Sequence, residues 1–245
     1  MSDYQIDVQL ISALRSGMHR YRLSDPSKPG LVLDLEHRDR LSSFSLEIVD
    51  SKTLVGHRIS SAWAREQHFY FYLQLSKEFD ENTYNEDSTK LILRFESIDE
   101  LLIKVGISAV SIEGAQKNLE AEIPHWDFEQ VRKEAESAWH NELSKVTVEM
   151  AEPTQDTIFY TALYHSYLNP NIFHDVDGNY RGTDLKVHHK PAAKQYTLFS
   201  LWDTYRASHP LYTITQVEKT KHFIHSFLNH YQDGGQLPMW ELAGY

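Results

Sequence analysis

Hydrophobic and polar positions change their spacing along this chain of 245 residues. Up to about residue 112, short apolar stretches alternate in part with polar residues and are rich in β-branched and aromatic side chains. Such stretches predict β-strands, and the clearest lie at residues 31–35, 44–49, 68–75 and 91–95. The polar segment 80–88 predicts a turn between two of them. Several short strands in succession favour an antiparallel sandwich.

From Phe128 onward the apolar side chains recur at intervals of three and four residues, which predicts a helix up to about Leu143. Asp127 is a suitable N-cap for this helix, and Thr154 is one for a second helix that extends through Ser166. A third helix is predicted at about residues 220–231, before Gly-Gly at 234–235. The segment 169–195 lacks periodicity, and spans of this length are usually functional loops or linkers.

Strands followed by helices predict an α+β protein, either as two domains or as one α+β unit. We expect residues 1–120 to form part of an N-terminal β-sandwich domain and residues 121–150 to form a linker with a connecting helix. Residues 151–245 would then begin a helical domain.

Composition and charge narrow the classes of partner. The formal net charge is −11, from 24 basic and 35 acidic side chains. We expect no nucleic-acid partner, because phosphate binding needs clustered Lys and Arg. The absence of Cys excludes disulfides and thiolate metal sites. No apolar run of about 18 residues occurs, so we expect no membrane span or membrane partner.

The densest group of candidate site residues is Trp202, Asp203 and Arg206. An aromatic plane can cover the C–H face of a sugar, while a carboxylate and a guanidinium can bind its hydroxyls. Asp203 and Arg206 would be neighbours if this segment is helical. The alternative is a structural salt bridge beside a buried Trp.

Two further segments carry candidate chemistry. Asp175 and Asp177 belong to an Asp-x-Asp-Gly sequence that resembles the start of a calcium loop, but position 12 is Lys186, so it is not an EF-hand. An ordinary turn is the alternative, and we assign no metal ligand. Near the end of the chain, Trp240 could stack on a sugar and Glu241 could accept its hydroxyl protons. The alternative there is a helix C-cap followed by a rigid Pro turn.

Several segments, taken in order, resemble glycoside hydrolase family 92. They are residues 105–108, 115–119, 159–166, 175–182, 199–211 and 234–240. The resemblance extends from about residue 20 to the end, and it implies a β-sandwich followed by the first helices of an (α/α)6 barrel. It also implies a calcium-dependent, exo-acting α-mannosidase that inverts the anomeric centre of α-mannoside oligosaccharides such as mannans or N-glycans. A periplasmic or secreted location is implied as well.

The resemblance places the catalytic residues beyond this chain. The family's acid lies in a Glu-Gly-Asn-x-Trp-Gln segment and its base in an Asp-x-Asp segment before Gly-Gln, both after the motif that contains Trp240, and neither occurs here. We therefore assign no catalytic residue, expect the isolated chain to be inactive, and expect the remainder of the catalytic domain to be its partner. Trp202, Asp203 and Arg206 are predicted to form a wall of the −1 subsite, with Arg206 orienting Asp203. Trp240 and Glu241 are predicted as further sugar contacts.

Two other interpretations stay open at this point. The chain could be a non-catalytic carbohydrate-binding or interaction module that retains the motifs, or a purely structural helical and β module. If it is part of a barrel, its helices should expose apolar side chains that absent neighbours would cover, for example Phe223, Phe227 and the region of Tyr231.

Overall fold

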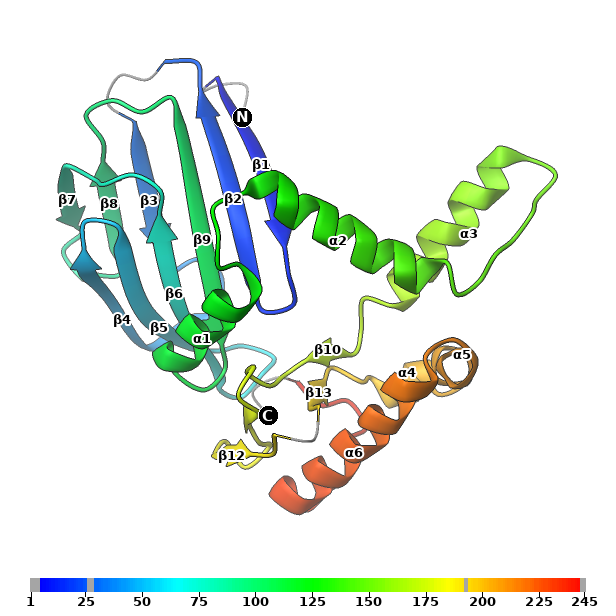
Figure 1. Cartoon of the computed structure of the whole chain (residues 1–245). Coiled ribbons are helices and arrows are strands. Elements are labelled where there is room, and N and C mark those ends of the chain that lie inside the picture. The colour runs from blue at the N-terminus through cyan, green and yellow to red at the C-terminus, as the bar shows by residue number, and fades with distance from the viewer. Residues whose placement is uncertain (1–4, 26–28, 192–193, 243–245) are drawn as a thin grey trace. The chain divides into compact units, whose positions relative to one another are not determined.

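The computed structural model describes residues 5–25, 29–191 and 194–242, and these form two compact units. The first unit is Met1–Arg132 together with Asp175–Asp177. The second unit is Lys133–His174 together with Gly178–Tyr245. Strands dominate the first unit and helices the second (Figure 1).

The first unit contains two antiparallel sheets. The larger has the strand order β1-β2-β9-β6-β5-β4 and the smaller has the order β3-β8-β7. The strands are β1 (Ile6–Ser12), β2 (Ser16–Leu23), β3 (Gly30–Asp34), β4 (Arg40–Asp50), β5 (Thr53–Ser61), β6 (Gln67–Leu75), β7 (Glu81–Tyr84), β8 (Lys90–Arg94) and β9 (Glu100–Ser108). Every pairing in these sheets is antiparallel, so the predicted antiparallel β-layer is confirmed.

A hydrophobic core joins the two sheets. Alternate residues of β6, namely Phe71, Leu73 and Leu75, are buried in the same cluster as Leu91 and Leu93 of β8. The period of two along each strand directs these side chains to one face. The two sheets therefore pack face to face as a sandwich.

Two local predictions for this unit need correction. The segment 80–88 is only partly a turn, because residues 81–84 form β7. Tyr84 packs on the core and its hydroxyl donates to the Leu46 carbonyl at 3.0 Å, which favours a strand there. In addition, α1 (Ile112–Glu122) was not predicted. The Ser111 side chain caps it by accepting the Gly114 N–H, and the helix packs on β9 and β6.

The predicted helices of the second half are present with some changes of boundary. α2 (Phe128–Leu143) has the predicted bounds, and the Asp127 carboxylate accepts the Gln130 N–H at 3.0 Å as expected of an N-cap. Thr154 is not the cap of α3 (Pro153–Ser166), because Pro153 already occupies the first turn and Glu152 is the N-cap residue. α6 (Val217–Gly234) is longer than predicted.

Short elements fill the region between these helices. They are β10 (Asn171–Ile172), β11 (Asn179–Arg181), β12 (Val187–His189), β13 (Tyr196–Thr197), α4 (Leu201–Thr204) and α5 (Ser208–Thr215). Strands of two or three residues leave most of the segment 169–195 irregular, as predicted. Among the described residues, no helix is long and apolar enough to cross a membrane.

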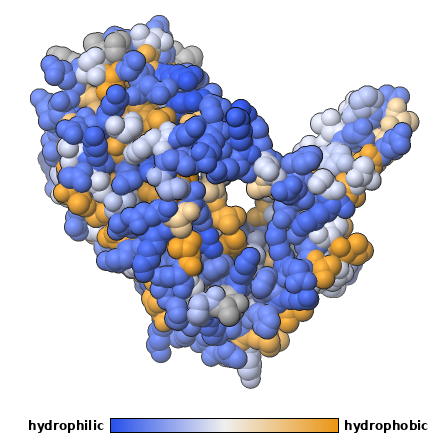
Figure 2. All heavy atoms as spheres, in the orientation of Figure 1, coloured by the Kyte–Doolittle hydropathy of each residue, from blue (hydrophilic) through white to orange (hydrophobic). Residues whose placement is uncertain are grey.

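The second unit has a small aromatic core, and this core corrects the predicted exposed residues. Tyr196, Phe199, Tyr212 and Phe223 are buried together, and Phe227 packs against them. Phe223 is only 4% exposed, so the prediction that it lies on an open face is wrong. The apolar side chains of α6 that are at least half exposed are Val217, Ile224, Leu228 and Tyr231. Figure 2 shows hydrophobic surface over α5 and part of α6.

Candidate functional site

A strained turn leads from β13 into α4. Leu198 has φ 63° and Ser200 has φ 46°, so both adopt left-handed backbone conformations. Neither residue is a glycine, and each such conformation costs on the order of 1–3 kcal/mol. Phe199 lies between them with its ring in the aromatic core of the second unit. Strain of this kind persists only where surrounding contacts fix the backbone, and it is common at functional sites.

Trp202 and Trp240 lie together beside this turn. Their ring centroids are 5.7 Å apart with an interplanar angle of 33°, and both rings are exposed. The Leu201 N–H donates to the Met239 carbonyl at 2.8 Å and so joins the two segments that carry them. The structure therefore brings together two residues predicted from different motifs. Two neighbouring exposed aromatic planes suit the C–H faces of sugars.

Asp203 is exposed on α4, but it does not pair with Arg206. Its carboxylate accepts the Ser200 hydroxyl at 2.6 Å, whereas Arg206 Nε donates to the Tyr205 hydroxyl at 2.6 Å. Within the described part of the chain, no ion pair joins Asp203 to Arg206, so the predicted orienting contact is wrong. α4 ends at Thr204, and the helical spacing needed for a contact three residues apart is therefore lost.

A cavity of about 350 Å³ adjoins the turn. Its walls include the aromatic and polar side chains of His165, Asn169, Ser200, His209 and Trp240. The Nε2 atom of His209 is buried without a hydrogen-bond partner in the described structure, and burial lowers the pKa of this imidazole. The volume and mixed lining are typical of a small-molecule pocket.

Glu241 was predicted as a sugar contact, but its carboxylate faces the protein backbone. The residue is only 6% exposed, and Oε1 accepts the Phe199 N–H at 3.1 Å. Burial raises the pKa of this carboxyl group, although the hydrogen bonds from the backbone act against the shift. Glu241 is not among the residues that line the cavity.

Asp175 and Asp177 bind α1 and the end of β9. Asp175 is 3% exposed and accepts hydrogen bonds from the Ser108 hydroxyl at 2.7 Å and the Asn118 amide at 2.8 Å. Asp177 accepts a hydrogen bond from Lys117 Nζ at 2.9 Å. Burial raises the pKa of Asp175, partly offset by these hydroxyl and amide donors. The two carboxylates therefore hold residues 175–177 against α1 and the end of β9.

These carboxylates do not fit a calcium site. Asp177 is neutralised by Lys117, and the buried carboxylate of Asp175 is already bound by two neutral donors. Calcium takes six to eight oxygen ligands, usually including several carboxylates. No cluster of three His, Cys, Asp or Glu side chains able to hold a metal occurs in residues 5–25, 29–191 and 194–242. Asp175 and Asp177 therefore do not form the calcium site that the resemblance implies.

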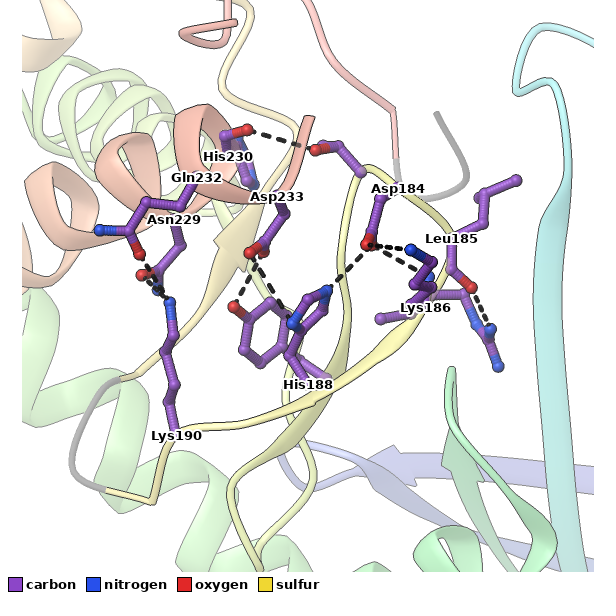
Figure 3. Close-up of polar contacts among 12 residues, drawn as sticks. Asp184, Leu185, Lys186, His188, Lys190, Asn229, His230, Gln232 and Asp233 are labelled. Atoms are coloured by element: carbon purple, nitrogen blue, oxygen red, sulfur yellow. Dashed lines mark hydrogen bonds and ion pairs between the residues drawn. The ribbon is translucent and has the colours of Figure 1, made fainter. Parts of the chain in front are cut away.

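A second polar cluster joins the β11–β12 hairpin to the end of α6 (Figure 3). The Tyr180 hydroxyl donates to Asp233 Oδ2 at 2.9 Å. The His188 ring lies between Asp184, with Nε2 to Oδ1 at 2.9 Å, and Asp233, with Nδ1 to Oδ1 at 3.8 Å. Lys190 Nζ donates to Asn229 Oδ1 at 2.5 Å.

This cluster fixes the start of the segment that carries Trp240, because Asp233 directly precedes Gly234 and Gly235. Burial alone would raise the pKa of Asp184, but hydrogen bonds from His188 and from the Lys186 N–H lower it overall. The sequence analysis missed the cluster because its residues lie about 50 positions apart and share no helical or strand period.

Comparison with known proteins places the chain in a family. The model of the glycosyl hydrolase family 92 N-terminal domain matches residues 1–108, and the model of that family's catalytic domain matches residues 114–245. The chain therefore belongs to glycosyl hydrolase family 92.

Solved structures agree with this assignment. The chain is similar to the family GH92 alpha-mannosidase BT3965 from Bacteroides thetaiotaomicron, with 31% identity and a TM-score of 0.89 over 99% of this chain and 36% of that one. It is also similar to the family GH92 inverting mannosidase BT2199 from Bacteroides thetaiotaomicron VPI-5482, with 25% identity and a TM-score of 0.87 over 98% of this chain and 35% of that one. The chain thus spans about a third of the length of these mannosidases.

A sequence relative adds one further match. An uncharacterized secreted glycosidase from Arthroderma benhamiae is 40% identical over 75 residues, which are 29% of this chain and 10% of that protein. The description of this relative as a glycosidase agrees with the family match.

Proposed function

We propose that this chain is part of a longer exo-acting α-mannosidase that hydrolyses α-linked mannose in mannans or N-glycans with inversion. The observation that carries the proposal is the similarity to BT3965 along 99% of the chain at 31% identity. BT2199 is described as an inverting mannosidase, and BT3965 also has a structure in complex with mannoimidazole. Both support a mannoside as the substrate.

The proposal also covers the domain organisation. Residues 1–120 would complete the N-terminal β-domain, residues 121–150 would connect it, and residues 151–245 would supply the first helices of an (α/α)6 barrel. The rest of that barrel would come from the part of the longer protein that corresponds to the unmatched remainder of BT3965. An exported location fits the secreted relative.

In this enzyme Trp202, Asp203, Arg206 and Trp240 would form part of the −1 subsite. The paired indoles would cover the C–H face of mannose, and the exposed Asp203 carboxylate would accept its hydroxyls. The Ser200 hydroxyl keeps Asp203 oriented without cancelling its charge. Arg206 would act independently of Asp203, as a hydroxyl donor.

The reacting groups would lie elsewhere in the longer protein. An inverting glycosidase needs a carboxylic acid and a carboxylate about 6.5–9.5 Å apart, with a water between the base and the sugar. We assign neither to this chain. We also propose calcium dependence for the whole enzyme, with ligands other than Asp175 and Asp177, which bind α1 and the end of β9.

The test is hydrolysis of an α-mannobiose by the full-length protein, followed by NMR in the first minutes. We expect β-mannose to appear first and chelation of calcium to abolish turnover. Release of α-mannose would contradict inversion. Binding of the disaccharide without hydrolysis would instead support a non-catalytic carbohydrate-binding module, the function that the exposed tryptophan pair favours next.

Asp203→Asn tests the subsite directly. It keeps the shape of the side chain and removes the charge, so kcat/KM should fall by about tenfold or more, at about 1.4 kcal/mol per decade. The melting temperature should change little, because Asp203 is exposed and its contact is a local one with Ser200. A lower melting temperature with nearly normal kinetics would make Asp203 structural.

A further inference from the structure

The carboxylate of Glu241 meets the main chain at the point where the site turn is most strained. Its acceptor contact is with the N–H of Phe199, and the residues on either side, Leu198 and Ser200, are the two with left-handed backbone. A buried amide in such a turn needs a partner, because an unsatisfied one is costly.

The Leu198–Ser200 turn also positions the proposed sugar contacts. Leu198, Phe199 and Ser200 all line the cavity. Ser200 donates its hydroxyl to Asp203, and its carbonyl accepts from Thr204 at the end of α4. A change in the left-handed residues would therefore move one cavity wall and the carboxylate of Asp203 together.

Glu241 reaches the turn from the segment that follows α6 and carries Trp240. Trp240 is its neighbour in sequence, and the Leu201 N–H donates to the Met239 carbonyl. One residue thus connects the segment that carries Trp240 with the segment that carries Trp202 and Asp203. Its other oxygen, Oε2, is buried without a hydrogen-bond partner in the described structure.

We infer that Glu241 is a positioning residue that holds the Leu198–Ser200 turn in its left-handed conformation and so sets the geometry of the sugar subsite. The inference rests on the proposed function for its kinetic consequences and on the contact with Phe199 for its structural ones. Glu241 acts through the backbone and does not touch the sugar.

Three substitutions in the full-length enzyme separate this role from a direct one. Glu241→Gln keeps an oxygen acceptor at the same length and should retain kcat within about threefold, whereas Glu241→Ala should lose about thirtyfold or more. Glu241→Asp withdraws the carboxylate from Phe199 and should fall between them. If Gln is as damaging as Ala, the charge acts on the substrate and the inference is wrong.

A rescue experiment tests the backbone mechanism itself. Leu198→Gly and Leu198→Ala both remove the leucine side chain from the cavity wall, but only glycine adopts positive φ without steric cost. In the Glu241→Ala background, Leu198→Gly should recover about tenfold more activity than Leu198→Ala. Equal activity of the two double variants would overturn the inference.

A measurement that does not depend on enzymatic activity distinguishes this inference from the proposed function. Hydrogen exchange of the Phe199 amide, followed by NMR, should be slow in the parent protein and in Glu241→Gln and at least about tenfold faster in Glu241→Ala. If the parent enzyme releases no mannose yet this pattern holds, only the proposed function fails. If Glu241→Ala lowers the melting temperature and leaves both exchange and kinetics normal, Glu241 is merely structural.

Discussion

At the scale of single residues, burial decides which charges the molecule can carry. His230 is 4% exposed and lies against the Phe199 ring at 6.0 Å between centroids. Burial lowers its pKa to about 4, and the nearby Asp233 only partly offsets this. Asp175 and Glu241 are acids with raised pKa values for the same reason. Burial therefore favours the neutral form of all three side chains.

His230 predicts a loss of stability in mild acid. An unfolded histidine has a pKa of about 6.5, so between that value and about 4 the unfolded chain binds more protons than the folded one. The free energy of unfolding should fall by about 2 kcal/mol between pH 7 and pH 5 through this group, at about 1.4 kcal/mol per pH unit.

Urea denaturation at pH 7 and pH 5 measures this effect. His230→Gln should remove that part of the pH dependence, even if it lowers stability at pH 7. His140→Gln, at an exposed position on α2, is the matched control and should leave the dependence unchanged. Equal pH dependence in His230→Gln and the parent chain would contradict the assignment.

At the scale of elements, the helices with a strong apolar periodicity in the sequence were predicted best. α2 has an unbroken apolar period and a capping Asp127, and its bounds were predicted correctly. α1 was missed although Ile112, Ala115 and Leu119 have helical spacing, because the segment is short and was grouped with the strands before it. α4 is a single turn that follows left-handed residues, and no periodic pattern can indicate so short an element.

In the candidate site, too, some features were predictable from the sequence and others were not. Trp202, Asp203 and Trp240 are site candidates because each stands in a motif, but the contact of Asp203 with Ser200 depends on where α4 ends. The backbone role of Glu241 depends on the φ angles of two residues about 40 positions away. Neither feature has a counterpart in residue spacing.

The link between the β11–β12 hairpin and α6 gives a prediction at this scale. Tyr180→Phe removes the donor to Asp233, whose side chain is 5% exposed, and leaves a buried carboxylate oxygen without that partner. The free energy of unfolding should fall by about 1–3 kcal/mol. Tyr231→Phe on the exposed face of α6 is the control and should stay within about 0.5 kcal/mol. If both variants are equally stable, the hydroxyl contact does not secure the hairpin.

At the scale of the whole molecule, one face of α6 bears on the proposal that further helices complete a barrel. Val217, Ile224, Leu228 and Tyr231 follow one another on α6 at spacings of seven, four and three residues, which places them on one face. The aromatic core uses an adjoining side of this helix, through the buried Phe223 and the partly buried Phe227. A helix that is apolar on two sides normally packs between neighbours on both.

This face predicts how the chain behaves on its own. Contiguous exposed apolar surface drives association, so the 245-residue chain should bind a hydrophobic dye and show a scattering mass that rises with concentration. Leu228→Glu should lower both by at least about half, because it places a charge in the middle of the face. His225→Glu, at an exposed position beside that face, adds a similar charge and should change neither substantially. The longer protein should not bind the dye here if barrel helices cover α6. A monodisperse 245-residue monomer that binds no dye would show that this face needs no covering, and would remove the support that it gives to a barrel completed by further helices.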